Sequence, residues 1–166
     1  LVDKTAEAGP PVGCDDKSVG FLVPVESFTS FFGKNKEDDS RRTDLLAIRI
    51  LLSTGPKGKI GISACGVEAK YVSGAYGIGR AHKALSQAQA SVQEFKKLVM
   101  YSLRSDSMPE RLALLEMVRF GLRIIGPSTP EDIQRWVDTE RVVCADILAG
   151  RYEYIDATQS ALLVST

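Results

Sequence analysis

Residues 45–65, LLAIRILLSTGPKGKIGISAC, decide the fold. A Gly-Pro-Lys-Gly turn at 55–58 separates two apolar runs that are rich in leucine, isoleucine and alternating small residues. Turn residues between two such runs are typical of a β-hairpin, and we expect residues 46–53 to pair with residues 59–65. A helix over residues 43–53 is the alternative, because the apolar residues of the first run also recur at helical spacing.

Downstream of this stretch, apolar residues recur at helical spacing and predict a helix over about residues 80–103. Its apolar stripe contains Leu85, Ala88, Val92, Phe95 and Val99, which alternate between spacings of three and four. Polar residues on its opposite side are mostly basic, so this helix should present one basic face to its surroundings.

Two further helices are bounded by capping residues. The second should begin at the capping box Ser107-Met-Pro-Glu110 and end at Gly126-Pro127. Its apolar residues cover most of the circumference, so we expect it to be the central buried helix. The third should start at Thr129-Pro130 and end at Gly150, with Trp136 as an anchor on its apolar face, and a short helix capped by Asp156 is expected in the tail.

These elements predict an α+β fold that is predominantly α-helical: an irregular N-terminal part with a β-hairpin, followed by a compact cluster of three to four helices. A chain of 166 residues with 44% hydrophobic content can fill one core. We expect a flexible arm over residues 1–18, which contain glycine, proline and mixed charges, and a single globular domain over 19–166 with its helical half at 80–166.

The charges are unevenly distributed although the net charge is zero. Residues 41–104 hold eleven Lys/Arg against three acids, whereas residues 1–40 hold four against eight and residues 105–166 hold six against ten. A basic segment of this kind favours binding of RNA or another polyanion, or of an anionic membrane surface. The alternative is that the acidic flanks neutralise it within the fold.

The candidate polyanion-binding residues are cations of this segment that fall on the basic helix face, project from the predicted turn or stand at the start of the segment: Arg41, Arg42, Lys57, Lys59, Arg80, Lys83, Lys97 and Arg104. Three tyrosines are interleaved with them and could stack on bases: Tyr71, Tyr76 and Tyr101. Packing at the edge of the core is the alternative for Tyr71 and Tyr76.

A glycine cluster formed by Gly74, Gly77 and Gly79 precedes the basic helix. Free backbone amides at a helix start suit a phosphate or carboxylate, so the loop from Gly74 to Lys83 is a candidate anion site, with a flexible connector as the alternative. The pattern is G-x-x-G-x-G and differs from the dinucleotide-binding G-x-G-x-x-G.

The sequence contains no complete catalytic or metal-binding constellation. His82 is the only histidine, and Cys14, Cys65 and Cys144 lie far apart without Cys-x-x-Cys spacing. We therefore expect no metal, no cofactor and no enzymatic activity. Three widely spaced cysteines and the lack of a membrane-spanning stretch or signal peptide favour a cytoplasmic, reducing location, and the missing initial Met suggests a cut or processed end.

Together these features favour an intracellular binding or assembly protein that holds RNA or another polyanion on a basic central surface and self-associates into a homo-oligomer. Size and charge are analogous to those of viral matrix or nucleocapsid components, without a matching motif. One alternative is a small protein or enzyme that binds a phosphate or carboxylate ligand in the Gly74–Lys83 loop. The other is a protein-interaction domain without nucleic-acid binding.

Overall fold

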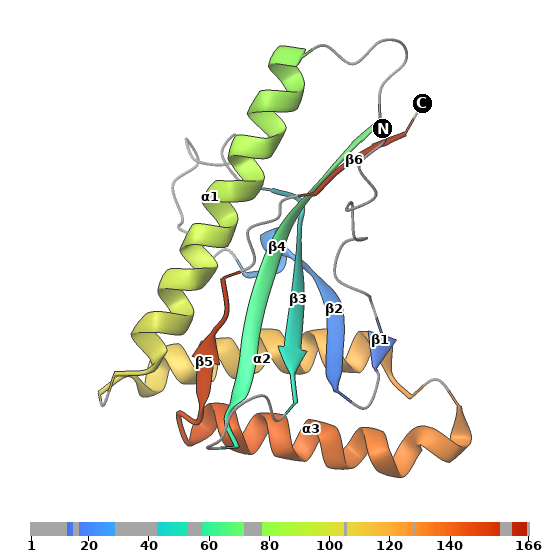
Figure 1. Cartoon of the computed structure of the whole chain (residues 1–166), viewed down its shortest axis with the longest axis vertical. Helices are drawn as coiled ribbons and strands as arrows, with labels where there is room; N and C mark the ends of the chain where they lie inside the picture. The colour runs from blue at the N-terminus through green and yellow to red at the C-terminus, as the bar shows by residue number, and fades with distance from the viewer. Residues whose placement is uncertain are drawn as a thin grey trace, which may run out of the picture.

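The computed structural model describes residues 13–14, 17–28, 43–52, 58–71, 78–104, 106–127, 129–156 and 161–165. They form a six-stranded sheet and three α-helices (Figure 1). The strands are β1 (Gly13–Cys14), β2 (Ser18–Pro24), β3 (Leu45–Leu51), β4 (Ile60–Tyr71), β5 (Tyr152–Tyr154) and β6 (Ala161–Ser165). The helices are α1 (Ile78–Ser102), α2 (Met108–Ile125) and α3 (Ile133–Leu148), and short 3-10 turns span Val25–Phe28 and Pro130–Asp132. The α+β class is confirmed.

The sheet combines an antiparallel half with a parallel edge. Strands β1, β2, β3 and β4 follow one another as antiparallel neighbours, and β5 and β6 both pair in parallel with β4. Parallel neighbours need a crossover connection, and the three helices between β4 and β5 provide it.

The decisive stretch folds as two antiparallel strands, as predicted, and the helical alternative is wrong. Strand β3 pairs with β4 from Leu45 opposite Val67 to Leu51 opposite Gly61. The predicted bounds are inexact, because β3 ends at Leu51 and β4 continues to Tyr71. The pair also lies inside the sheet, between β2 and the β5/β6 edge, and does not stand alone as a hairpin. Residues 53–57 of the predicted turn lie outside the described residues.

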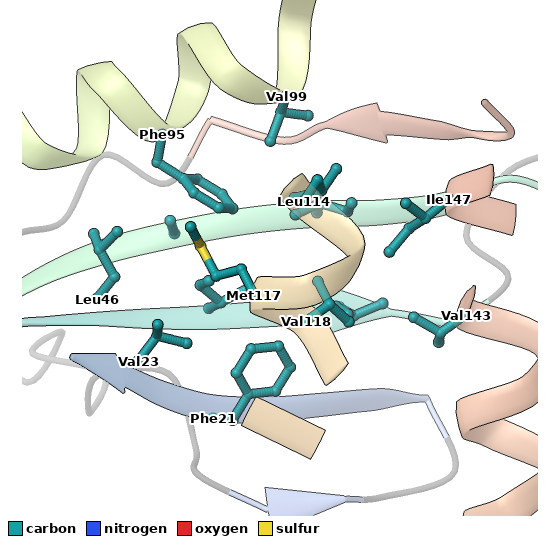
Figure 2. Packing of buried hydrophobic residues seen from close by; sticks show 14 of the residues in the cluster. Phe21, Val23, Leu46, Phe95, Val99, Leu114, Met117, Val118, Val143 and Ile147 are labelled. Atoms are coloured by element: carbon teal, nitrogen blue, oxygen red, sulfur yellow. The ribbon is translucent and has the colours of Figure 1, made fainter. Parts of the chain in front are cut away.

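One face of the sheet carries the core. Alternate strand residues point toward the helices, so that Phe21, Ile48 and Ala64 lie side by side in register, all with at most 1% of their surface exposed. Figure 2 shows residues of all three helices converging on this face, among them Phe95 of α1 and Met117 of α2. The helices therefore form a layer against the sheet, so the predicted compact cluster of three to four helices is inexact.

The predicted helices are present, with differences at their starts. The capping box at Ser107 is wrong: its side chain does not cap α2, and its single hydroxyl hydrogen is shared between the carbonyls of Ser102 and Arg104. The third helix begins with the 3-10 turn Pro130–Asp132 before α3 proper. Trp136 is buried, as expected of an anchor. In the part of the chain that the structure describes, no helix is long and apolar enough to cross a membrane.

The tail forms strands, so the predicted terminal helix is wrong. The open edge of β4 presents unpaired backbone groups, and β5 and β6 satisfy them. Asp156 accepts two hydrogen bonds from Lys96 Nζ, the shorter at 2.6 Å, and residues 157–160 lie outside the described residues. At the other end, residues 1–12 of the predicted arm lie outside the described residues, whereas Gly13–Cys14 and Ser18 belong to β1 and β2.

Candidate functional site

A groove lies along the side of α2 that faces away from the sheet. Its volume is about 470 Å³, within the usual range for binding sites. The groove, called the α2 groove below, is lined by Phe28, Leu112, Leu115, Glu116, Arg119, Phe120, Arg123 and Ile124. Seven of these eight residues belong to α2, so the site is an open trough along one helix and not an enclosed cavity.

Helix α2 has more apolar residues than the core can take. Leu114, Met117 and Leu122 are completely buried against the sheet. The helical period places Leu112 and Ile124 on other sides of the helix, where 51% and 62% of their surfaces are exposed. These two side chains mark the ends of the α2 groove and leave apolar surface in contact with water.

Two aromatic residues, Phe28 and Phe120, form one wall of the α2 groove. Pro24 ends β2, and the 3-10 turn that follows places Phe28 against α2. The rings of Phe28 and Phe120 meet edge to face, with their centroids 5.5 Å apart. Because Phe28 is itself buried, this wall is fixed by the fold and provides a preformed apolar surface.

Two arginines give the groove a cationic character. Arg119 Nε lies 3.7 Å from Oε1 of Glu140 on α3, a long and partly exposed ion pair that contributes little to stability. Arg123 is exposed and forms no ion pair with any described residue. Among the described residues of the lining, Glu116 alone is acidic, so the site suits an apolar group that bears a negative charge.

Cys144 on α3 lies beside these arginines. Burial is the main cause that raises the pKa of its thiol, and Glu140 adds to the rise, while Arg119 and Arg123 oppose it. The thiol therefore stays protonated at neutral pH and is a poor nucleophile. Within the described ranges no cluster of three His, Cys, Asp or Glu side chains could hold a metal ion, and His82 is exposed on α1.

The predicted polyanion-binding residues that the structure describes are spread over different elements. Arg80 and Lys83 lie in the first turns of α1, and Lys97 follows Arg80 by 17 residues, about 26 Å along the helix axis. Lys59 precedes β4 at the end of the sheet where Ile60 pairs with β5. Arg41, Arg42 and Lys57 lie outside the described residues.

Some of these cations are engaged within the fold. Lys97 Nζ forms a 2.7 Å ion pair with Glu94, and the guanidinium of Arg104 stacks on the ring of Tyr101 at 4.4 Å. Of the predicted anion loop, Gly79 lies in the first turn of α1, whereas Gly74 and Gly77 lie outside the described residues. Tyr76 also lies outside them, and Tyr71 ends β4.

The sequence interpretation missed the α2 groove, although a signal for it was present. It assigned most of the circumference of α2 to the core, but a helix packed against one sheet face can bury only part of its surface. The surplus residues Leu112, Phe120 and Ile124 therefore indicate a second contact surface. The chain matches no protein-family model, no curated protein and no solved structure.

Proposed function

We propose that this protein is a non-enzymatic binding and assembly protein that holds an apolar, acidic α-helical segment of a protein partner in the α2 groove. The exposure of Leu112 and Ile124 beside Arg119 and Arg123 is the observation that carries this proposal. A helix in such a groove would cover the exposed apolar side chains and bring its carboxylates to the two guanidinium groups.

The shape of the groove favours a helix over a small molecule. Leu112 and Ile124 are twelve residues apart, so the trough extends about 18 Å along α2. A small ligand is usually enclosed on most sides, whereas this site is lined almost entirely by one helix and by Phe28. An amphipathic helix with apolar residues three and four positions apart matches a trough of this length.

The test is a titration of the protein with fluorescently labelled amphipathic helical peptides that share one apolar face and differ only in net charge. We expect the acidic peptide to bind most tightly and the basic peptide least. Leu112→Glu should weaken binding of the acidic peptide by about 10- to 100-fold, because burial of a leucine side chain contributes about 1.5–3 kcal/mol. Fluorescence anisotropy measures both effects.

Met100→Glu is the matched control, because Met100 is also 51% exposed but belongs to α1 and does not line the groove. It should leave peptide binding unchanged. The proposal is wrong if no peptide binds, or if Met100→Glu and Leu112→Glu weaken binding equally.

We also propose polyanion binding as a second candidate function. It is favoured by the surplus of eight positive charges in residues 41–104 and by the exposure of Lys59, Arg80 and Lys83. Binding that neutralises several phosphates falls steeply with salt concentration.

Labelled single-stranded RNA should therefore lose affinity by at least about 10-fold between roughly 50 and 200 mM salt. Lys83→Glu should weaken binding more than Lys97→Glu on the same helix, because Glu94 already neutralises Lys97. An electrophoretic mobility shift titration compares the two variants. Absence of binding at low salt would leave internal neutralisation as the explanation of the basic segment.

A further inference from the structure

A second apolar feature lies on α3 and has no partner in the described fold. Ile133, Val137 and Leu148 expose 50%, 49% and 40% of their surfaces, and half-buried Cys144 lies between them. Their spacings of four, seven and four residues put all four side chains on one side of the helix. We call this row the α3 stripe.

The α3 stripe borders the α2 groove. Glu140, which reaches Arg119, lies one turn from both Val137 and Cys144 on the same side of α3. Cys144 itself is close enough to Arg119 and Arg123 for both to affect its thiol. One region of the surface therefore presents a trough and a neighbouring ridge, and two such regions can face each other about a two-fold axis.

The charges of the two elements are opposite in sign. Residues 130–148 hold five acids and two arginines, but Asp146 is buried and paired with Arg151, so the other charges sum to −2. Helix α2 holds three arginines and two glutamates, a net charge of +1. Contact between α3 of one copy and α2 of another therefore brings unlike charges together. Contact between two α3 helices would place like charges against each other.

We infer that the partner is a second copy of this chain, with the α3 stripe of each copy packed into the α2 groove of the other. This inference rests on the proposed function of the groove as a site for a helix. The apolar row supplies the anchors at helical spacing, and the net negative charge of α3 complements Arg123, which forms no ion pair with any described residue of its own copy.

The test is sedimentation equilibrium of the whole chain from about 1 µM to about 1 mM, a range that covers weak and moderate dimers. We expect reversible dimers. Val137→Glu should raise the dissociation constant by at least about 10-fold, since it places a charge in the buried contact. Val142→Glu is the matched control: Val142 is 48% exposed on the same helix but lies off the stripe, so dimerisation should not change.

A mixing experiment separates contact between groove and stripe from contact between two stripes. Val137→Glu damages the stripe and Leu112→Glu damages the groove, so each variant alone has both contacts broken. A mixed dimer of the two variants retains one contact with an intact groove and an intact stripe. We expect the mixture to associate more tightly than either variant, and circular dichroism should show that both are folded.

The inference is overturned if the wild-type chain stays monomeric over the whole range, if Val142→Glu disrupts dimers as strongly as Val137→Glu, or if mixing gives no rescue. A monomeric chain that still binds acidic helical peptides would refute self-association and leave the proposed function intact. A dimer that is insensitive to Leu112→Glu, with no peptide binding at all, would instead refute the role of the groove.

Discussion

Gly66→Ala is expected to destabilise the fold by about 3 kcal/mol or more, because the site has no room for a methyl group. Gly66 lies in β4 opposite Leu46, on the face that carries the core. A Cβ atom at this position would clash with the carbonyl oxygen of Ala88 and would lie 2.7 Å from its Cα. These are backbone atoms of α1, so no side-chain rotation can relieve the clash.

The only relief is a movement of α1 away from the sheet, and the core opposes it. Ala88 is completely buried at the crossing of α1 over β4, and Phe95 of the same helix is completely buried further along. Shifting the helix would open space around Phe95, and empty space in a core costs stability. Urea denaturation followed by circular dichroism measures the loss.

Gly79→Ala provides the control. Gly79 lies in the first turn of α1, and a Cβ there would meet nothing within 4 Å. Alanine should be neutral or stabilise the helix by up to about 1 kcal/mol. Equal unfolding midpoints for Gly66→Ala and the wild type would show that α1 does not approach β4 as closely as described.

The helices could be predicted because their signals are local. The row of apolar residues in α1 and the Gly126-Pro127 stop after α2 lie within the elements that they define. The hairpin was predictable for the same reason, since its turn and its two runs are adjacent. The layer formed by the helices was not predictable, because it depends on which sheet face they cover.

The tail could not be predicted because its structure depends on distant residues. Tyr152–Tyr154 and Ala161–Ser165 are too short to define a period, and they become strands by pairing with β4, about 90 residues earlier in the chain. Charge pairing can also depend on distant residues. Lys97 pairs locally with Glu94, but Lys96 pairs with Asp156, sixty residues away. A linear charge count therefore overstates the basic surface.

Prediction of the α2 groove requires both local sequence patterns and contacts between residues that are distant in the chain. The surplus of apolar residues on α2 can be read from the sequence, whereas the wall contributed by Phe28 cannot, because it comes from a segment some ninety residues away. The Arg119 to Glu140 pair likewise depends on how α3 folds back along α2. Composition can thus indicate a second contact surface without locating its boundaries.

Tyr152→Ala is the second substitution with a large expected effect, a loss of about 3–5 kcal/mol, by analogy with other large aromatic residues truncated in a core. Tyr152 is 1% exposed in β5, and its hydroxyl donates a 2.7 Å hydrogen bond to Ser102 Oγ at the end of α1. The Ser102 hydroxyl in turn donates to the carbonyl of Val99. Removing the ring leaves a cavity and deprives Ser102 of its donor.

Tyr152 connects β5 of the sheet with the helices of the crossover between β4 and β5. The carbonyl of Ser102 accepts hydrogen bonds from Arg111 Nε and from the Ser107 hydroxyl, so α1, the start of α2 and β5 meet at one residue. Loss of Tyr152 should therefore weaken the attachment of β5 more than that of β3. Amide hydrogen exchange resolves the two strands, and uniform loss of protection would argue against such a joint.

Tyr152→Phe separates the hydroxyl from the ring and should cost only about 1–2 kcal/mol, with a similar value for Ser102→Ala. Because both changes break the same hydrogen bond, the double variant should lose less than the sum of the two. If the stability losses of the two single variants add up in the double variant, the hydrogen bond between Tyr152 and Ser102 is contradicted.

The pH dependence gives an independent readout of the same hydroxyl. Burial raises the pKa of Tyr152 above its ordinary value of 10.0, so the folded protein favours the neutral phenol. The contribution of the neutral Tyr152 phenol to the free energy of unfolding is fully present below pH 10.0. It is lost as the pH rises through the folded-state pKa of Tyr152. Tyr152→Phe has no phenol to ionise, so its stability should fall less steeply in this alkaline window than that of the wild type. Parallel pH profiles would mean that the Tyr152 hydroxyl is solvated in the folded state, and that β5 is held by backbone pairing and ring packing alone.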